Sequence, residues 1–490
     1  MNESCHHALR DYLTALDAAS FLPEEYRAFG ELITEGLAFF LNRLPACRLS
    51  GILNKQASLA DRTAPERLVA LMCDSPTLHK LGQVVARDRR LAPTLRQQLM
   101  QLESMSPLTS IEHVRELLQR ELFSNEEFSQ VQVEDQPLAE ASVAVVARFA
   151  WNRRGAHREV HGVFKVLRPE IEDRLIEELA VFSDLGAFLE EQCQARGLPT
   201  IDYRETFERA RDLLVNEVRL DGEQSNLAEA AAAFGASPEV VIPELLPFCT
   251  RRVTAMGFIE GPTVADVVRA GGENGRRTAR LIVEALIAKP MFAMESDALF
   301  HADAHAGNML VTPEGRLGLI DWSLVGHLGK DVREQIVQII LGGATCDSKR
   351  IGRAVEALSH ATPDRSELRV IAADSLRAVR NGGLPGLAWL TDLLDRAALS
   401  ARVRFDDDLL LYRKTLLTLE GVIADLDGEC PVDAILLAEA TQRMIREWPR
   451  RFAQLPTSRA FSTHISSFDL AELIWSGPAS LMRFWTGMAR

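Results

Sequence analysis

Paired cysteines and an excess of basic residues are both missing from this chain of 490 residues. Its seven cysteines are scattered, and no two of them form a CxxC motif. This usage indicates free thiols in a reducing compartment rather than a disulfide framework or a zinc ribbon. The formal net charge is -14, whereas a protein that binds nucleic-acid backbones needs a basic face. Nucleic acid is therefore not an expected partner.

Long apolar runs, a signal peptide and a glycine-rich phosphate loop are missing too. The N-terminal sequence MNESCHHALRDYL lacks the basic and then apolar order of a secretory signal. No uninterrupted apolar run is long enough to cross a bilayer. We therefore expect a cytoplasmic protein, with peripheral membrane contact left open. Because no GxGxxG run occurs, the phosphate cradle of conventional protein kinases is excluded.

The residues that can carry chemistry are concentrated in the stretch FHADAHAGNMLVTPEGRLGLIDW, residues 300–322. Asp303, Asn308 and Asp321 each follow a short apolar segment. An aspartate that orients a hydroxyl, together with an amide and a second carboxylate that hold Mg²⁺, are the parts of a phosphoryl-transfer site. The sequence therefore predicts Asp303 as a catalytic residue and Asn308 and Asp321 as metal ligands.

A hairpin should bring the two metal ligands together. The apolar runs 309–311 and 317–320 predict two short strands, and the run Thr-Pro-Glu-Gly at 312–315 predicts the turn between them. Asn308 then precedes the first strand and Asp321 follows the second.

The two histidines of this stretch have an alternative interpretation. His301 and His305 are four residues apart, as in a helical zinc pair. The run 304–308 is a poor helix interior, however, and no third ligand lies at metal spacing. We expect His301 to hold the loop through backbone hydrogen bonds, with zinc as the minor alternative.

The run HADAHAGN at 301–308 resembles the HxDxHPxN catalytic loop of the UbiB/AarF (ADCK-like) family of atypical protein-kinase-like proteins. Upstream, the run KLGQ at 80–83 resembles the KxGQ motif of that family. The resemblance implies an α+β, protein-kinase-like fold with two lobes, in which extra N-terminal helices carry the KxGQ motif. It also implies ATP and Mg²⁺ as ligands, and a helix over the active site that directs Lys80 and Gln83 at the nucleotide.

Five regions follow from these motifs and from the helical and strand patterns. We expect an N-terminal helical region at 1–75, a KxGQ helical extension at 76–134, a kinase-like N-lobe with an antiparallel sheet at 135–262, a helical C-lobe with the catalytic loop at 263–430, and a C-terminal helical tail at 431–490.

One lysine lies inside the apolar run 161–169. A lysine buried in a strand is costly unless it is paired, so Lys165 is predicted to contact the nucleotide phosphates and to pair with a glutamate. The partner should lie on a helix near 213–234, where Glu217 and Glu223 both fit the resemblance. Six helical residues turn about 600°, so the two glutamates cannot both face Lys165, and the sequence leaves the choice open. A solvated Lys165 on an edge strand is the alternative.

Two further segments are expected at the nucleotide. The run 137–144 resembles the alanine-rich loop that replaces the glycine-rich loop in this family, and its small residues let the backbone approach a ligand. We expect Ala139, Ala141 and Ser142 to contact the nucleotide. Glu140 departs from the family pattern, and its carboxylate would repel a triphosphate unless it points away or binds metal.

The other segment, 256–261, resembles a kinase hinge. Its backbone groups, at Met256 and Phe258 in particular, are expected to bind an adenine edge.

Three functions remain open from the sequence. The first is an ATP-dependent kinase or ATPase of the UbiB type that acts on a small, lipophilic molecule such as a quinone or isoprenoid. The second is a small-molecule phosphotransferase of the aminoglycoside-kinase type, which also ends its metal strand in Ile-Asp-Trp. The third is a nucleotide-sensing pseudokinase that acts as a binding partner; the departures from the family pattern that favour it are Glu140, Arg219, Ala304, Ala306 and Ser323.

The tail ends in LAELIWSGPASLMRFWTGMAR. Its apolar and basic residues are compatible with a membrane interface, and they include Trp475, Met482, Arg483, Phe484, Trp485 and Arg490. Docking of this apolar face on the protein itself is the favoured expectation. The sequence does not predict an oligomeric state.

Overall fold

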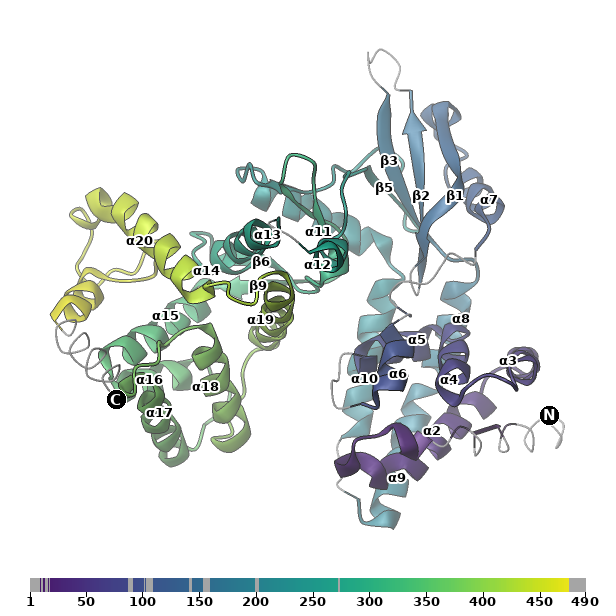
Figure 1. Cartoon of the computed structure of the whole chain (residues 1–490), viewed down its shortest axis with the longest axis horizontal. Helices are drawn as coiled ribbons and strands as arrows, with labels where there is room; N and C mark the ends of the chain where they lie inside the picture. Colours follow the sequence, from purple (N-terminus) through teal and green to yellow (C-terminus); the bar gives the residue numbers. More distant parts are fainter. Residues whose placement is uncertain are drawn as a thin grey trace. The chain divides into compact units, whose positions relative to one another are not determined.

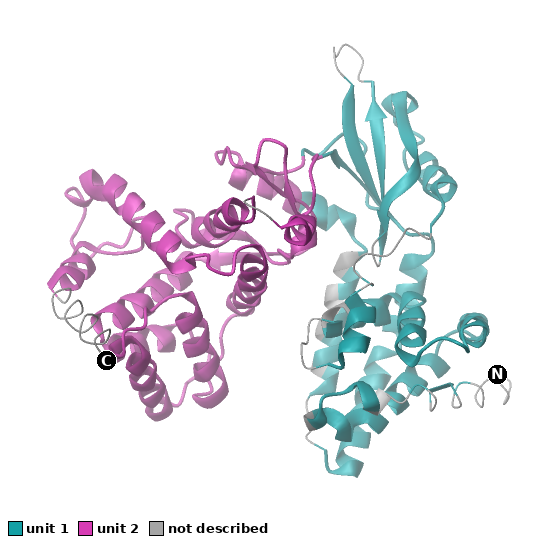
Figure 2. Ribbon diagram, in the orientation of Figure 1, with its two compact units in different colours: residues 1–225, 244–258 teal, residues 226–243, 259–490 magenta. Residues whose placement is uncertain are grey.

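The structure is a computed structural model. It describes residues 9, 12, 13, 16 and 18–475, apart from 87–90, 101, 103–108, 141–142, 153–158, 199–201 and 272–273. The chain divides into two compact units (Figure 2), and each is described by itself. The first holds residues 1–225 and 244–258, and the second holds 226–243 and 259–490. Residues 226–243, which the sequence analysis assigns to the region 135–262, thus cluster with the second unit.

The first unit contains a four-stranded antiparallel sheet with the strand order β1-β2-β3-β5 (Figure 1). Its strands are β1 (Val131–Glu140), β2 (Ala144–Trp151), β3 (Val160–Leu167) and β5 (Val253–Gly257). Burial alternates along β2 because one of its faces packs on a core. The core residues come from the sheet and from helix α7 (Ile111–Glu121), whose apolar side covers it.

Helices make up the rest of the first unit. Before the sheet lie α2 (Gly30–Asn42), α3 (Ala46–Ser58), α4 (Ala64–Cys73), α5 (Pro76–Ala86) and α6 (Pro93–Met100). After β3 come α8 (Ile171–Leu179), α9 (Phe182–Arg196) and α10 (Tyr203–Glu217). The helices α2, α3, α8 and α9 share a second apolar core. The described part of 1–75 contains the helices α2, α3 and α4.

The helix predicted around 213–234 is not continuous, which corrects the sequence analysis. Helix α10 ends at Glu217, and α11 (Leu220–Phe234) begins after a two-residue break. The first turn of α11 contains Asp221 and Glu223, and acidic side chains are favoured at a helix N-terminus because of the helix dipole. The angular argument that Glu217 and Glu223 must diverge along one helix therefore does not apply.

The second unit is mostly helical, with two small sheets. The strands β4 (Val240–Val241), β7 (Met309–Val311) and β8 (Leu317–Leu319) form one sheet, while β6 (Asp297–His301) and β9 (Val325–Gly329) form the other. The predicted hairpin is confirmed, because β7 pairs antiparallel with β8 and the N–H of Gly315 closes the turn on the carbonyl of Thr312 at 2.8 Å.

Most of α11 belongs to the second unit, and the other helices of this unit follow the hinge-like segment. They are α12 (Val264–Ala270), α13 (Asn274–Ile282), a π-helical turn (Val283–Ala288), α14 (Lys289–Met291), α15 (Lys330–Thr345), α16 (Ser348–Ala357), α17 (Arg365–Arg380), α18 (Leu387–Ser400), α19 (Asp407–Leu426) and α20 (Val432–Arg451). An antiparallel sheet in one unit and a mostly helical second unit confirm the predicted α+β class. Of the helices that the structure describes, none has the length and apolar character needed to cross a membrane.

Candidate active site

The catalytic-loop residues lie between β6 and β7 of the second unit, and a buried histidine holds the loop. Nε2 of His301 lies 3.0 Å from the carbonyl of Ile320, and its Nδ1 accepts the N–H of Asp303 at 3.2 Å. These two bonds require the neutral tautomer with the proton on Nε2. Burial lowers the pKa of His301, which favours the same neutral form. His301 thus ties the loop to the end of β8, as expected, and no metal-binding group of three or more His, Cys, Asp or Glu side chains occurs among the described residues.

Asn308 ties Asp303 to Ile320, which directly follows β8. The side-chain Nδ2 of Asn308 donates to the backbone carbonyl of Asp303 at 3.1 Å. The backbone carbonyl of Asn308 accepts the N–H of Ile320 at 3.0 Å. The first bond fixes the amide so that Nδ2 is used inside the loop, leaving Oδ1 as the atom suited to a cation. Asn308 stands directly before β7. Its backbone partner is Ile320, and Asp321 is the next residue in the chain.

Asp321 has an unusual backbone conformation. Its φ is 58°, in the left-handed region that only a few non-glycine residues, aspartate and asparagine among them, adopt readily. Oδ1 of Asp321 accepts the N–H of Ser323 at 3.3 Å. The buried Trp322 between them anchors this turn, because its indole donates to the carbonyl of Leu319 and its carbonyl accepts the amide of Asn226.

One amide oxygen and one carboxylate on neighbouring strand ends fit Mg²⁺. This ion usually takes one or two protein oxygen ligands and completes its shell with phosphates and water. Asn308 and Asp321 would hold it. Bound there, Mg²⁺ would neutralise charge on nucleotide phosphates.

Helix α19 supports the loop from a distant part of the sequence. Oγ1 of Thr415 lies 3.3 Å from the carbonyl of Ala302 and 3.0 Å from that of Leu411 in its own helix, and the ring of Tyr412 packs edge-on against Phe300 at 5.0 Å between centroids. Nζ of Lys414 lies 4.0 Å from Oδ1 of Asp303. Lys414 was not predicted from the sequence, since a lysine on an amphipathic helix carries no local signal that it contacts Asp303.

In the first unit, Lys165 is buried and paired. Its Nζ lies 2.8 Å from Oε1 of Glu223, and both side chains are almost fully enclosed. Lys165 sits in β3 between Val146 of β2 and Thr254 of β5, so the alternative of a solvated edge-strand lysine is wrong. The open choice between the two glutamates is also resolved: Glu223 pairs with Lys165. Glu217 is the last residue of α10, and its side chain lies outside the described part of the chain.

The alanine-rich segment carries a compensated charge. Oε1 of Glu140 lies 3.1 Å from Nε of Arg168, and its Oε2 accepts the N–H of Thr109 at 2.8 Å. The repulsion expected from Glu140 is therefore reduced by Arg168, a second residue whose role the sequence analysis missed. Ala139 belongs to β1 rather than to a loop and is exposed. Ala141 and Ser142 lie outside the described residues.

Some backbone groups of the hinge-like segment are already hydrogen-bonded to other residues of the first unit. Met256 pairs with Val163 of β3, and the N–H groups of Gly257 and Phe258 donate to the carbonyls of Glu244 and His161. Adenine binding by Met256 and Phe258 stays a prediction, and it cannot use the Phe258 N–H while this bond persists.

The KxGQ run lies on α5. Lys80 is half-buried, and the side chain of Gln83 lies outside the described part. A Cβ at Gly82 would approach Leu102 Cδ1 to 2.6 Å and Met72 Sδ to 2.7 Å, so glycine lets α5 pack closely on its neighbours.

The start of α5 is held by a buried carboxylate. Oε2 of Glu178, on α8, accepts the hydroxyls of Ser75 and Thr77 and the N–H of Thr77, all within 3.0 Å. Arg48 donates to its other oxygen.

Comparison with known proteins assigns the chain to a family. The model of the ABC1 atypical kinase-like domain matches residues 101–355. The chain belongs to this family.

Relatives and a solved structure agree with the assignment. A protein of Actinobacillus pleuropneumoniae named Probable protein kinase UbiB is 28% identical over 371 residues, which are 72% of this chain and 66% of the relative. One of the same name from Xanthomonas axonopodis is 27% identical over 444 residues, 86% of this chain and 77% of the relative. The structure of the Rv3197–erythromycin complex from Mycobacterium tuberculosis is similar with a TM-score of 0.51 and 18% identity, over 67% of this chain and 82% of that chain.

This last likeness concerns the fold alone. Together with the family match, it confirms the kinase-like α+β fold and the UbiB/ADCK-like resemblance of this ABC1-family chain.

Proposed function

We propose that this ABC1-family chain binds ATP with Mg²⁺ and uses it for phosphoryl transfer to a small molecule or for ATP hydrolysis. The observation that carries the proposal is the loop in which the amide of Asn308 bonds to the backbone of Asp303 while its carbonyl holds Ile320, next to Asp321. This network prepositions an aspartate, an amide oxygen and a second carboxylate, and prepositioned polar groups supply most of the catalysis in phosphoryl transfer.

Each residue has a distinct proposed role. Asp303 orients the attacking hydroxyl or water and accepts its proton. Lys414, whose ammonium lies 4.0 Å from that carboxylate, stabilises charge on the transferred group. Asn308 and Asp321 hold the metal.

Lys165 contacts the nucleotide phosphates, and Glu223 fixes its ammonium. Lys80 and Gln83 regulate access to the nucleotide. The roles of Lys165 at the phosphates and of Lys80 and Gln83 at the nucleotide entrance are inferred from the family resemblance.

The acceptor we propose is a small, lipid-like molecule, of the quinone or isoprenoid kind implied by the family resemblance. The printed name of the relatives, Probable protein kinase UbiB, leaves a protein acceptor as a competing class. The cytoplasm is the proposed compartment; the six described cysteines are all free thiols, in keeping with reducing conditions.

The two alternatives are now less favoured. The ABC1 match over residues 101–355 speaks for the UbiB type and against the aminoglycoside-kinase type. The pseudokinase hypothesis is weakened at one of its supporting residues, because Glu140 is paired with Arg168.

Thermal unfolding of the full chain with ATP or ADP, each with and without Mg²⁺, tests the proposal. We expect a Mg²⁺-dependent rise in Tm, because a ligand that binds only the folded state stabilises it. ATP turnover is then measured with and without quinone precursors or isoprenoid alcohols. Binding without turnover under any of these conditions would favour the pseudokinase, and no shift with either nucleotide would contradict ATP binding itself.

A further inference from the structure

The backbone carbonyls on the two sides of Asp321 are both held by side chains. Nε2 of His301 lies 3.0 Å from the carbonyl of Ile320. Nδ2 of Asn226, on α11, donates to the carbonyl of Trp322 at 2.9 Å. The left-handed backbone of Asp321 is thus fixed from both directions. Such a conformation persists where the surrounding structure determines it, and it is common at functional sites.

The ring of Trp322 is enclosed as well. Trp322 is buried, and its indole lies 4.6 Å from the imidazole of His301 and 6.0 Å from the ring of Phe234, between centroids. Phe234 is the last residue of α11, the helix that also contains Asn226. Nζ of Lys289 lies 5.0 Å from the centroid of the Phe234 ring, which supports that ring by a cation–π contact. Helix α11 therefore contacts Trp322 both at its backbone and at its ring.

The turn after Asp321 lacks the glycine of the Asp-Phe-Gly segment of conventional kinases. Ser323 stands at that position, and its N–H donates to Oδ1 of Asp321 at 3.3 Å. A residue with a Cβ has fewer backbone conformations than glycine. The orientation of the Asp321 carboxylate therefore depends on the contacts that hold this one arrangement of the turn.

We propose that Asn226 is a positioning residue for the metal site. Its amide holds the peptide after Asp321 and so keeps the Asp321 carboxylate where it can bind Mg²⁺. The inference rests on the proposed function, in which Asn308 and Asp321 hold this ion. Nδ2 of an asparagine is a hydrogen-bond donor and cannot bind a cation, so this contact acts through the backbone of Trp322. Loss of a side chain that orients a metal ligand typically weakens metal affinity by about 10- to 100-fold.

Binding of Mn²⁺ tests this role without a measurement of turnover. The full chain is mixed with a non-hydrolysable ATP analogue and titrated with Mn²⁺, whose electron paramagnetic resonance signal is lost when the ion binds. We expect Asn226→Ala to raise the Kd for Mn²⁺ by about tenfold or more. Phe234→Leu removes the ring contact to Trp322 but leaves the hydrogen bond in place, and it should raise this Kd as well. This second variant serves if Asn226→Ala folds poorly.

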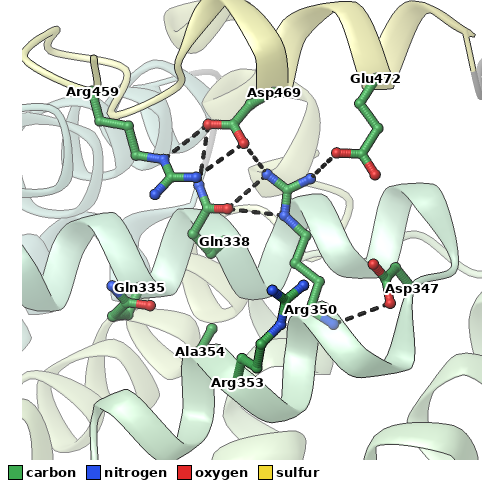
Figure 3. Close-up of a pocket in the computed structure, with 9 residues that line it drawn as sticks. All are labelled: Gln335, Gln338, Asp347, Arg350, Arg353, Ala354, Arg459, Asp469 and Glu472. Carbon is green, nitrogen blue, oxygen red and sulfur yellow. Dashed lines mark hydrogen bonds and ion pairs between the residues drawn. The ribbon is translucent and has the colours of Figure 1, made fainter. Parts of the chain in front are cut away.

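The matched control is another carboxamide on a helix of the second unit. Gln338 of α15 is buried in a network of charged side chains (Figure 3), in which its Oε1 accepts from Arg350 and its Nε2 lies 3.4 Å from Asp469. This network joins the segment 459–472 to α15 and α16 and includes none of the residues around Asp321. Gln338→Ala should lower the Tm, because it leaves buried polar groups without a partner, and should keep the Mn²⁺ Kd of the parent chain.

ATP turnover at varied Mg²⁺ separates positioning from general damage to the fold. Asn226→Ala should need about tenfold more Mg²⁺ than the parent chain for half-maximal turnover. Excess Mg²⁺ should then restore most of the parent kcat, because a weakened site fills at a higher ligand concentration. A misfolded site would not recover in this way.

Hydrogen exchange in the nucleotide-free chain tests the contact itself. Peptides that cover residues 319–324 should exchange at least about tenfold faster in Asn226→Ala than in the parent chain, because the turn opens more often. In Gln338→Ala they should exchange at the parent rate.

Three results would overturn the inference. They are an unchanged Mn²⁺ Kd in Asn226→Ala, equal increases of this Kd in Asn226→Ala and Gln338→Ala, and unchanged exchange of residues 319–324. A parent chain that binds neither the nucleotide nor Mn²⁺ would contradict the proposed function and, with it, the metal role of Asn226. The exchange measurement would still decide whether Asn226 holds the turn.

Discussion

Nζ of Lys414 on α19 lies 4.0 Å from Oδ1 of Asp303 in the catalytic loop. The loop run HADAHAGN contains no lysine or arginine of its own. The positive charge beside the aspartate is therefore delivered by a helix that follows the loop much later in the chain. Thr415 of α19 contacts Ala302 in this loop, and Tyr412 packs on Phe300 of β6, so α19 lies beside the loop, while the side chain of Lys414 itself is 48% exposed.

Lys414→Ala should lower kcat for ATP turnover by about 100-fold while leaving the KM for ATP nearly unchanged. The reason is that a cation aimed at charge that develops in the transition state contributes to kcat rather than to ground-state binding. Steady-state kinetics over a range of ATP concentrations measures the two constants separately. Lys414→Arg is the matched control and should retain most of the activity. Loss of ATP binding in Lys414→Ala with kcat unchanged would contradict the assignment.

Asp321→Asn and Asp303→Asn should separate binding from chemistry. Asparagine tolerates the left-handed backbone of Asp321, so the first substitution removes the charge without adding strain. It should abolish the Mg²⁺-dependent rise in Tm given by ATP. Asp303→Asn should keep that rise and lower turnover at least about 100-fold. If both variants keep the Mg²⁺-dependent rise, Asp321 is not a metal ligand.

Arg168→Met should weaken ATP binding, because it leaves the carboxylate of Glu140 without its cation. A single uncompensated charge near the phosphates is expected to raise Kd by about tenfold. Isothermal titration measures the effect. The double variant Glu140→Ala with Arg168→Met should restore the affinity, since both charges are then gone. An unchanged Kd in Arg168→Met would separate Glu140 from the phosphate site.

His464 should make the stability of the second unit depend on pH. Burial, with Arg333 and Lys330 nearby, lowers its pKa from 6.5 to about 4. The unfolded chain therefore binds a proton between these values that the folded chain does not bind, so stability is full above pH 6.5 and is lost as the pH falls toward 4. The expected loss between pH 7.5 and 5.5 is about 1 kcal/mol.

Urea unfolding at these two pH values measures the change. His464 has a φ of 53°, so His464→Asn is the suitable variant, and its unfolding free energy should depend less on pH. An equal pH dependence in the parent and the variant would assign the effect to other groups.

Features that depend on neighbouring residues were predictable from the sequence. The hairpin at 309–319 follows from two apolar runs and a Thr-Pro-Glu-Gly turn, and the burial of Lys165 follows from its apolar strand. The helix break at residues 218–219 was not predictable, because the helical pattern of the sequence continues across these two residues. In the structure a new helix starts there, with acidic residues in its first turn.

Contacts between distant segments could not be read from the sequence. The approach of Lys414 to Asp303 depends on how α19 packs beside β6, and the bond from Arg168 to Glu140 depends on the strand register. The preference for Glu223 over Glu217 likewise depends on where α11 starts. In each case the side chains are ordinary charged residues, and tertiary packing alone selects the partner.

The buried carboxylate of Glu178 has a mechanical consequence. It fastens the start of α5 to α8, and α8 begins four residues after β3, the strand that contains Lys165. The helix that carries Lys80 and the strand that carries Lys165 are therefore connected through α8. A ligand that moves one of the two lysines should therefore move the other as well, unless it first breaks the three hydrogen bonds that Ser75 and Thr77 make to the carboxylate of Glu178.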